Sequence, residues 1–115
     1  MTRKLLWTAL AVLCSACVTE NYVVLRPEGG KIRAVRETDK PLKCTTLGDV
    51  HGTSRSQDEA KAREGAQNNI RNEAARYKGA NFVLIEIDRV KPMGTSPYRE
   101  IFMAGKALKC EEGGS

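Results

Sequence analysis

The stretch Ser56–Val90, SQDEAKAREGAQNNIRNEAARYKGANFVLIEIDRV, decides the fold, because it joins one helix pattern to one strand pattern. The first part carries a stripe of mostly small apolar residues at helical spacing: Ala62, Ala66, Ile70, Ala74 and Tyr77. This spacing predicts an amphipathic helix. The segment Ser56–Glu59 has the form of a capping box and predicts where the helix begins, and Gly79 predicts where it ends. Gly65 is unfavourable in a helix, so its presence indicates close packing on a sheet.

The second part, Phe82–Val90, predicts a strand. Its apolar start, Phe82–Ile85, is typical of a central strand that is covered on both faces. Glu86 and Asp88 then indicate that one face opens to water. These carboxylates stand two residues apart on one strand face, which would suit paired-carboxylate chemistry, although a solvated strand edge is the favoured interpretation.

Three other segments alternate in polarity and predict strands: Lys31–Arg36, Leu42–Val50 and Tyr98–Cys110. Gly48 and Gly105 interrupt the last two and indicate β-bulges, and we expect a loop over residues 51–55. The order strand, strand, helix, strand, strand predicts an α+β domain. In it, one amphipathic helix packs on a small, mostly antiparallel sheet of about four strands.

The predicted fold does not explain two features of the sequence. The helix carries a polar cluster that could bind something, although a solvated face is the favoured interpretation: Gln67, Asn68, Asn69 and Asn72. The apolar run Val23–Leu25 precedes the first strand and could pair at a sheet edge.

The beginning of the chain, Met1–Cys17, predicts export and lipidation. Two basic residues, Arg3 and Lys4, precede an apolar run and the small pair Ser15-Ala16, which directly precedes Cys17. A charged start, an apolar middle and a small-residue cleavage site define an export signal. We expect cleavage before Cys17 and a diacylglyceryl group on its thiol. A plain secretory signal cut at the same bond is an alternative, whereas the apolar run is too short for a transmembrane helix.

The 115 residues suffice for one domain. We divide them into a lipoprotein signal (1–16), a lipid-anchored tether (17–30), one α+β domain (31–110) and a polar tail (111–115). Loss of Arg3 and Lys4 with the signal reduces the 19 basic residues to 17, against 14 acidic ones. A net charge of +3 is a weak argument for nucleic acid, and we expect no nucleic-acid partner.

Cys44 and Cys110 are the cysteines that follow Cys17. An exported protein with two such cysteines most simply pairs them, so we predict one disulfide that braces the domain. The alternative is a metal site formed with His51, but the close cysteine pairs of common zinc sites are missing. We therefore expect no metal, no cofactor and no catalytic residue.

Several segments are similar to a known family. These are Leu25–Arg33 (LRPEGGKIR), Cys44–Val50 (CTTLGDV), Asn72–Ala75 (NEAA), Gly79–Val83 (GANFV) and Gly105–Cys110 (GKALKC). They resemble the small bacterial lipoproteins of the family called domain of unknown function 4156, which is itself distantly similar to the outer-membrane Rcs stress-sensor lipoprotein. The resemblance implies a helix on a small sheet. Because Val18, and not Asp, follows the lipidated cysteine, it also implies sorting to the outer membrane.

Together these observations predict a lipid-anchored, periplasm-facing envelope lipoprotein that acts as an interaction or stress-sensing module. Its expected partners are the membrane, through the lipid on Cys17, and an envelope protein. The alternative is a small-ligand or metal-binding periplasmic domain. We do not expect an enzyme, because no set of residues resembles an assembled catalytic site.

Overall fold

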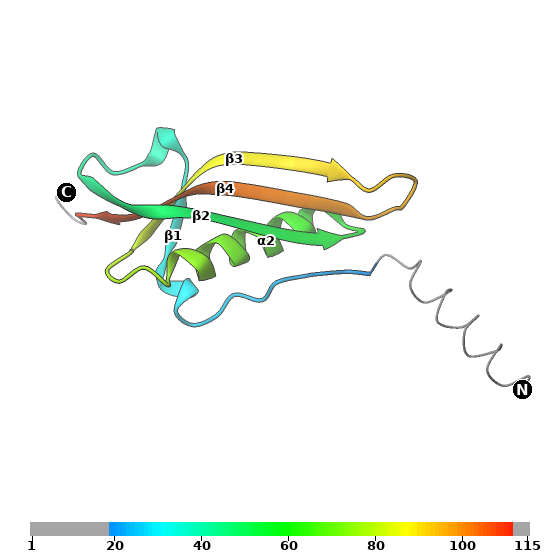
Figure 1. Ribbon diagram of the computed structural model, residues 1–115, viewed down its shortest axis with the longest axis horizontal. Helices are drawn as coiled ribbons and strands as arrows, with labels where there is room; N and C mark the ends of the chain where they lie inside the picture. The colour runs from blue at the N-terminus through cyan, green and yellow to red at the C-terminus, as the bar shows by residue number, and fades with distance from the viewer. Residues whose placement is uncertain (1–18, 112–115) are drawn as a thin grey trace, which may run out of the picture.

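The computed structural model describes residues 19–111, so Cys17 and the predicted signal lie outside the described residues. The elements follow the order η1 (Gly29–Lys31), β1 (Arg33–Val35), η2 (Glu37–Asp39), β2 (Cys44–Ser56), α2 (Glu59–Ala74), β3 (Phe82–Pro92) and β4 (Arg99–Cys110). The four strands form one sheet in the order β1-β3-β4-β2, in which only the β1–β3 pair is parallel. Helix α2 lies along one face of this sheet (Figure 1). The predicted α+β fold and its order of strands and helix are confirmed.

The helix begins slightly later than the capping box predicts. The cap is Asp58, whose side chain accepts a hydrogen bond from the Ala60 N–H (3.0 Å), so the predicted role of Ser56 as the cap is wrong. Ser56 is the last residue of β2, and its hydroxyl oxygen accepts the Asp58 N–H (3.2 Å). The helix also ends earlier than predicted, at Ala74 with Ala75 as its C-cap, so the predicted role of Gly79 as the helix stop is wrong. Gly79 has a φ of 87° and lies in the turn that leads to β3.

Strand β2 is longer than predicted, because the expected loop over residues 51–55 is strand. Its inward residues are too small to show an apolar pattern: Gly52, Ser54 and Ser56 are all buried. A Cβ on Gly52 would lie 2.6 Å from the Ile70 nitrogen and 2.7 Å from the Ala66 oxygen of α2. The helix therefore lies so close to β2 that only very small residues fit between them.

Two apolar clusters form the core on opposite faces of the sheet. The larger one fills the space under α2 and includes Ile32, Ile70, Val83, Ile101 and Met103. The smaller one lies beside the disulfide and contains Val35, Phe82, Leu84, Leu108 and Cys110. Because adjacent residues of a strand face opposite ways, β3 contributes alternately to both clusters. This confirms the prediction that the start of β3 is covered on both faces.

One predicted bulge is present and the other is displaced. The pairing of β2 with β4 shifts between Thr46 and Gly48, as predicted. The second irregularity lies on β3, between Ile85 and Ile87, and Gly105 of β4 is in register with Ile85 across from it. A Cβ on Gly105 would collide with the backbone carbonyl oxygen of Leu84. This glycine is therefore required by the close approach of β3, and the prediction of a bulge at Gly105 itself is wrong.

Candidate functional site: the N-terminal strap

Residues Thr19–Arg26, which we call the N-terminal strap, are the part of the described chain nearest to Cys17. In Figure 1 they run as a blue segment beside α2 before the chain enters η1. The strap pairs with the end of β2 through a bridge between Asn21 and Arg55. The Asn21 N–H donates to the Arg55 oxygen and the Arg55 N–H donates to the Asn21 oxygen, both at 2.9 Å. The edge of the sheet thus fixes the beginning of the strap.

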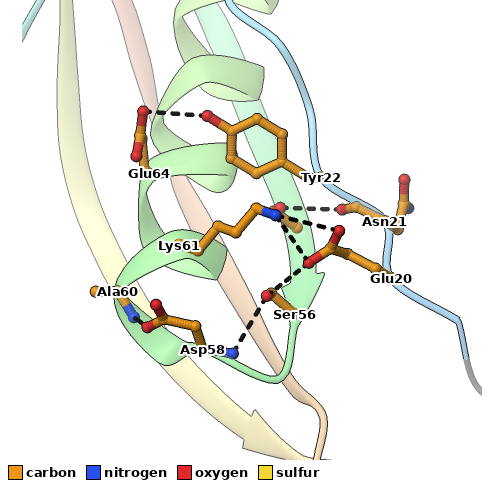
Figure 2. A network of polar contacts seen from close by, with 9 residues as sticks. Glu20, Asn21, Tyr22, Ser56, Asp58, Ala60, Lys61 and Glu64 are labelled. Atoms are coloured by element: carbon orange, nitrogen blue, oxygen red, sulfur yellow. Dashed lines mark hydrogen bonds and ion pairs between the residues drawn. The ribbon is translucent and has the colours of Figure 1, made fainter.

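Charged side chains hold the strap at the same end of the sheet (Figure 2). The Glu20 carboxylate accepts hydrogen bonds from the Ser56 hydroxyl (2.8 Å) and from Lys61 Nζ (3.3 Å). These two donors stabilise the ionised form and lower the pKa of Glu20. The guanidinium of Arg55 donates from Nε to the Thr19 oxygen (2.7 Å). Thr19 and Glu20 are therefore both attached to the domain.

Tyr22 continues these contacts along α2 (Figure 2). Its hydroxyl donates to Glu64 Oε1 (3.1 Å) and accepts from Asn68 Nδ2 (3.3 Å), and Lys61 Nζ lies 5.4 Å from the centre of its ring. Burial disfavours the phenolate and the Glu64 carboxylate repels it, so the pKa of Tyr22 is raised. The ring thus packs on α2 while its hydroxyl keeps polar partners.

Asparagine amides of α2 replace the backbone pairing that the strap lacks. Asn68 Nδ2 donates to the Val23 oxygen and Asn72 Nδ2 donates to the Val24 oxygen, both at 3.0 Å. Asn72 Oδ1 also accepts the Arg26 N–H (2.9 Å). The interpretation of these asparagines as a solvated face is therefore wrong. The apolar run 23–25 is held by side chains of α2, where the sequence suggested pairing at a sheet edge.

A third asparagine protects the outer edge of the sheet. Asn69 Nδ2 donates to the Thr53 oxygen of β2 (3.1 Å), and the Tyr77 hydroxyl donates to the Asp49 oxygen (3.1 Å). These carbonyl groups belong to an edge strand, where unpaired groups favour association with another strand. One signal in the sequence could have revealed this role. Asparagine is a poor helix former, so three asparagines within five residues of a helix imply that their amides have specific partners.

The predicted disulfide is present. Cys44 and Cys110 are bonded (Cα–Cα 4.0 Å) and are in register at the ends of β2 and β4. The predicted lipidation site, Cys17, lies outside the described residues. Within residues 19–111, no helix has the length and apolar character needed to cross a membrane.

The proposed metal ligands are not brought together. The disulfide occupies the sulfur atoms of Cys44 and Cys110, and His51 lies seven residues further along β2, or about 20 Å at the rise of a strand. In the described part of the chain, no three His, Cys, Asp or Glu side chains are arranged to hold a metal ion.

His51 lies on the sheet face opposite α2. Its ring stacks on Phe102 of β4 with 6.4 Å between the ring centres. The two rings line a shallow depression of about 510 Å³ together with Glu86, Ile87 and Ala104, among others. This face is the second candidate surface of the domain, and we call it the open face.

Glu86 and Asp88 do not form a carboxylate pair, because the bulge in β3 lies between Ile85 and Ile87. Glu86 lines the depression on the open face. The Asp88 carboxylate instead accepts hydrogen bonds from Arg36 (2.8 Å) and from Arg63 of α2. Partial burial would raise the pKa of Asp88, but the two guanidinium groups together outweigh it and lower the pKa.

These features define a small α+β domain with one helix, one disulfide and a strap that ties the start of the described chain to the helix and the sheet. Residues 23–110 match the family described as Domain of unknown function (DUF4156), and the chain belongs to this family. The matched region begins within the strap, at Val23, and ends at the second cysteine of the disulfide. Among proteins of curated function, none matches the chain.

Proposed function

We propose that this chain is an exported lipoprotein of the bacterial cell envelope. In this proposal the signal 1–16 is removed, Cys17 carries the lipid, and the domain faces the periplasm from the outer membrane. The domain acts without catalysis of its own, as an interaction or stress-sensing module for an envelope protein.

The observation that carries the proposal is the position of Cys17 directly after the small pair Ser15-Ala16 at the end of an export signal. The Cys44–Cys110 disulfide supports it, because such bonds persist in oxidising compartments such as the periplasm. The strap adds further support, because it begins two residues after Cys17 and leads directly to the domain.

Metabolic labelling with palmitate tests the anchor. The natural chain is expected to be labelled and to sediment with membranes, and mass spectrometry is expected to find an acylated Cys17 as the first residue. Cys17→Ala should lose the label. Cys14→Ala is the matched control and should keep it, because Cys14 would be discarded with the signal. An unmodified mature amino terminus would refute the anchor.

The open face supports the interaction role, because it exposes apolar and aromatic side chains beside charged ones. Ile87 remains 37% exposed, and Phe102 is only half-buried. A photo-crosslinking amino acid at position 87 in living cells is expected to capture one discrete envelope protein. The same amino acid at Lys78, an exposed residue after α2, serves as the control. Equal products at both positions would refute the open face as the binding surface.

A further inference from the structure

The strap limits how far the domain can lie from its anchor. Thr19 is already fixed, because its oxygen accepts the Arg55 guanidinium and its neighbour Glu20 is held by Ser56 and Lys61. Only two residue steps separate Thr19 from Cys17, and they span at most about 7 Å. If Cys17 carries the lipid, as the proposed function states, the end of the sheet at Arg55 and Ser56 must lie next to the bilayer.

The β3–β4 hairpin lies at this same end. Arg99 is in register with Ser56 of β2 on one side and with Pro92 of β3 on the other, and adjacent strands lie about 4.8 Å apart. The strap residue Glu20 contacts the same Ser56. In Figure 1 the loop that joins β3 to β4 extends past the arrowhead of β2, on the side where the strap begins. The hairpin therefore projects toward the surface that holds the anchor.

The composition of this hairpin suits the boundary between lipid headgroups and acyl chains. The segment Arg89–Arg99, RVKPMGTSPYR, contains three basic residues and no acidic one. Its apolar residues include Val90, which is 39% exposed, and Met93 and Tyr98 near the tip. Apolar and aromatic groups flanked by basic side chains are the usual composition of segments that bind at a membrane interface.

The basic residues of the hairpin have two different roles. Arg89 and Lys91 are exposed, whereas the guanidinium of Arg99 donates to the oxygens of Ser96 (3.4 Å) and Tyr98 (3.1 Å) and so shapes the turn. Two acidic residues at this end have cationic neighbours, whereas Asp58 is exposed and caps α2. Glu20 is paired with Lys61, and Glu100 is in register between Arg55 of β2 and Lys91 of β3.

We propose that the β3–β4 hairpin, residues 89–99, is a membrane-docking site that rests on the same bilayer as the lipid of Cys17. The tip enters the headgroup region with Met93 and Tyr98, and Arg89 and Lys91 bind lipid phosphates. The strands then run away from the membrane surface, and the end of the sheet that carries the disulfide is farthest from the bilayer, in the periplasm.

Tryptophan quenching tests this orientation, because the only tryptophan of the chain, Trp7, lies in the predicted signal. Thr95→Trp and Tyr98→Trp place a reporter at the tip, and Leu42→Trp is the matched control. Leu42 is fully exposed and precedes β2 at its far end, about 40 Å along the strand from Ser56. The full lipidated proteins are reconstituted into vesicles of phosphatidylethanolamine and phosphatidylglycerol, with or without bromine on the acyl chains.

Brominated lipid is expected to quench both tip reporters, with emission shifted to shorter wavelength, and to leave the Leu42→Trp reporter unchanged. An acylated protein whose tip reporters are no more quenched than the control would overturn the docking site and leave the proposed anchor intact. A protein without an acyl group on Cys17 would overturn both. Arg89→Glu with Lys91→Glu in the Thr95→Trp protein is expected to reduce quenching, and unchanged quenching would overturn the role of the two cations.

Discussion

Gly52 shows how the absence of one methyl group sets the distance between α2 and the sheet. Its hydrogen atom points at backbone atoms of Ala66 and Ile70, which cannot move aside as a flexible side chain can. Gly65 has the matching role on the helix, where a Cβ would collide with the hydroxyl of Ser54. This contact confirms the prediction, made from the low helix propensity of glycine, that Gly65 permits close packing on the sheet.

We expect Gly52→Ala to lower the free energy of unfolding by about 1–3 kcal/mol, because added volume in a packed interior forces the backbone to shift. Gly30→Ala is the control, since the nearest atom to its added Cβ, in the Leu25 side chain, lies 4.0 Å away. Denaturation with guanidinium chloride, followed by circular dichroism, measures both. Equal stability of the two variants would contradict the proposed packing.

Asp88 makes the free energy of unfolding depend on pH in the acidic range. Because its pKa is lower in the folded protein than the ordinary value of 3.8, the ionised carboxylate stabilises the fold above about pH 3.8. This contribution is lost as the pH falls through the lower folded pKa. We expect Asp88→Asn to cost about 1 kcal/mol at pH 7 and to cost nothing once the natural side chain is protonated. Free energies of unfolding measured from pH 7 to pH 2 test this, and a cost that stays constant over this range would contradict it.

At the scale of elements, the strap is attached by side chains where a strand would use backbone pairing. Asn68 and Asn72 bind three backbone groups of the strap: the oxygens of Val23 and Val24 and the N–H of Arg26. Each such bond contributes about 0.5–1.5 kcal/mol net. The strap is therefore held by several modest interactions that single substitutions can remove.

We expect Asn68→Ala combined with Asn72→Ala to detach the strap while α2 stays folded. The amide of Arg26 loses its acceptor, so its hydrogen exchange should accelerate much more than exchange in the core strands β3 and β4. Amide-resolved hydrogen exchange measures this, with Gln67→Ala on the same helix as the control. Slow exchange at Arg26 in the double variant would show that other contacts hold the strap.

The sequence predicted the elements whose apolar residues recur at a regular spacing. It did not predict the segments whose structure depends on contacts with other elements. Helix α2 and the start of β3 carry their apolar faces in the sequence. The second half of β2 does not, because Gly52 and Ser54 meet the helix with almost no side chain. The strap was missed for a related reason. An amide that binds a backbone group and an amide in water look the same in a sequence, and only the fold places Asn72 beside Val24.

For the whole molecule, the two ends of the sheet are secured in different ways. The end at Cys44 and Cys110 is closed by a covalent bond across β2 and β4. The opposite end carries the hairpin, the beginning of α2 and the beginning of the strap, and Glu20 of the strap is bound there to Ser56 of β2 and Lys61 of α2 by a hydrogen bond and an ion pair. Covalent reinforcement is thus concentrated at the end that, in our proposal, lies farthest from the membrane.

We expect Cys44→Ser with Cys110→Ser to lower the free energy of unfolding by about 2–4 kcal/mol, because the bond closes a long loop in the unfolded chain. Denaturation of the natural protein with and without reductant provides an independent measurement. A loss well below this range in both experiments would show that the bond contributes little in this fold.

The direction of the strap has a mechanical consequence. The strap begins beside Ser56 and follows α2 toward Asn72, so in the proposed lipoprotein a pull from the bilayer on the first residues would act along the length of the strap. Such a load strains all the strap contacts at once, in shear, and does not peel them away one after another. Contacts that are weak singly would then resist such a load as a group.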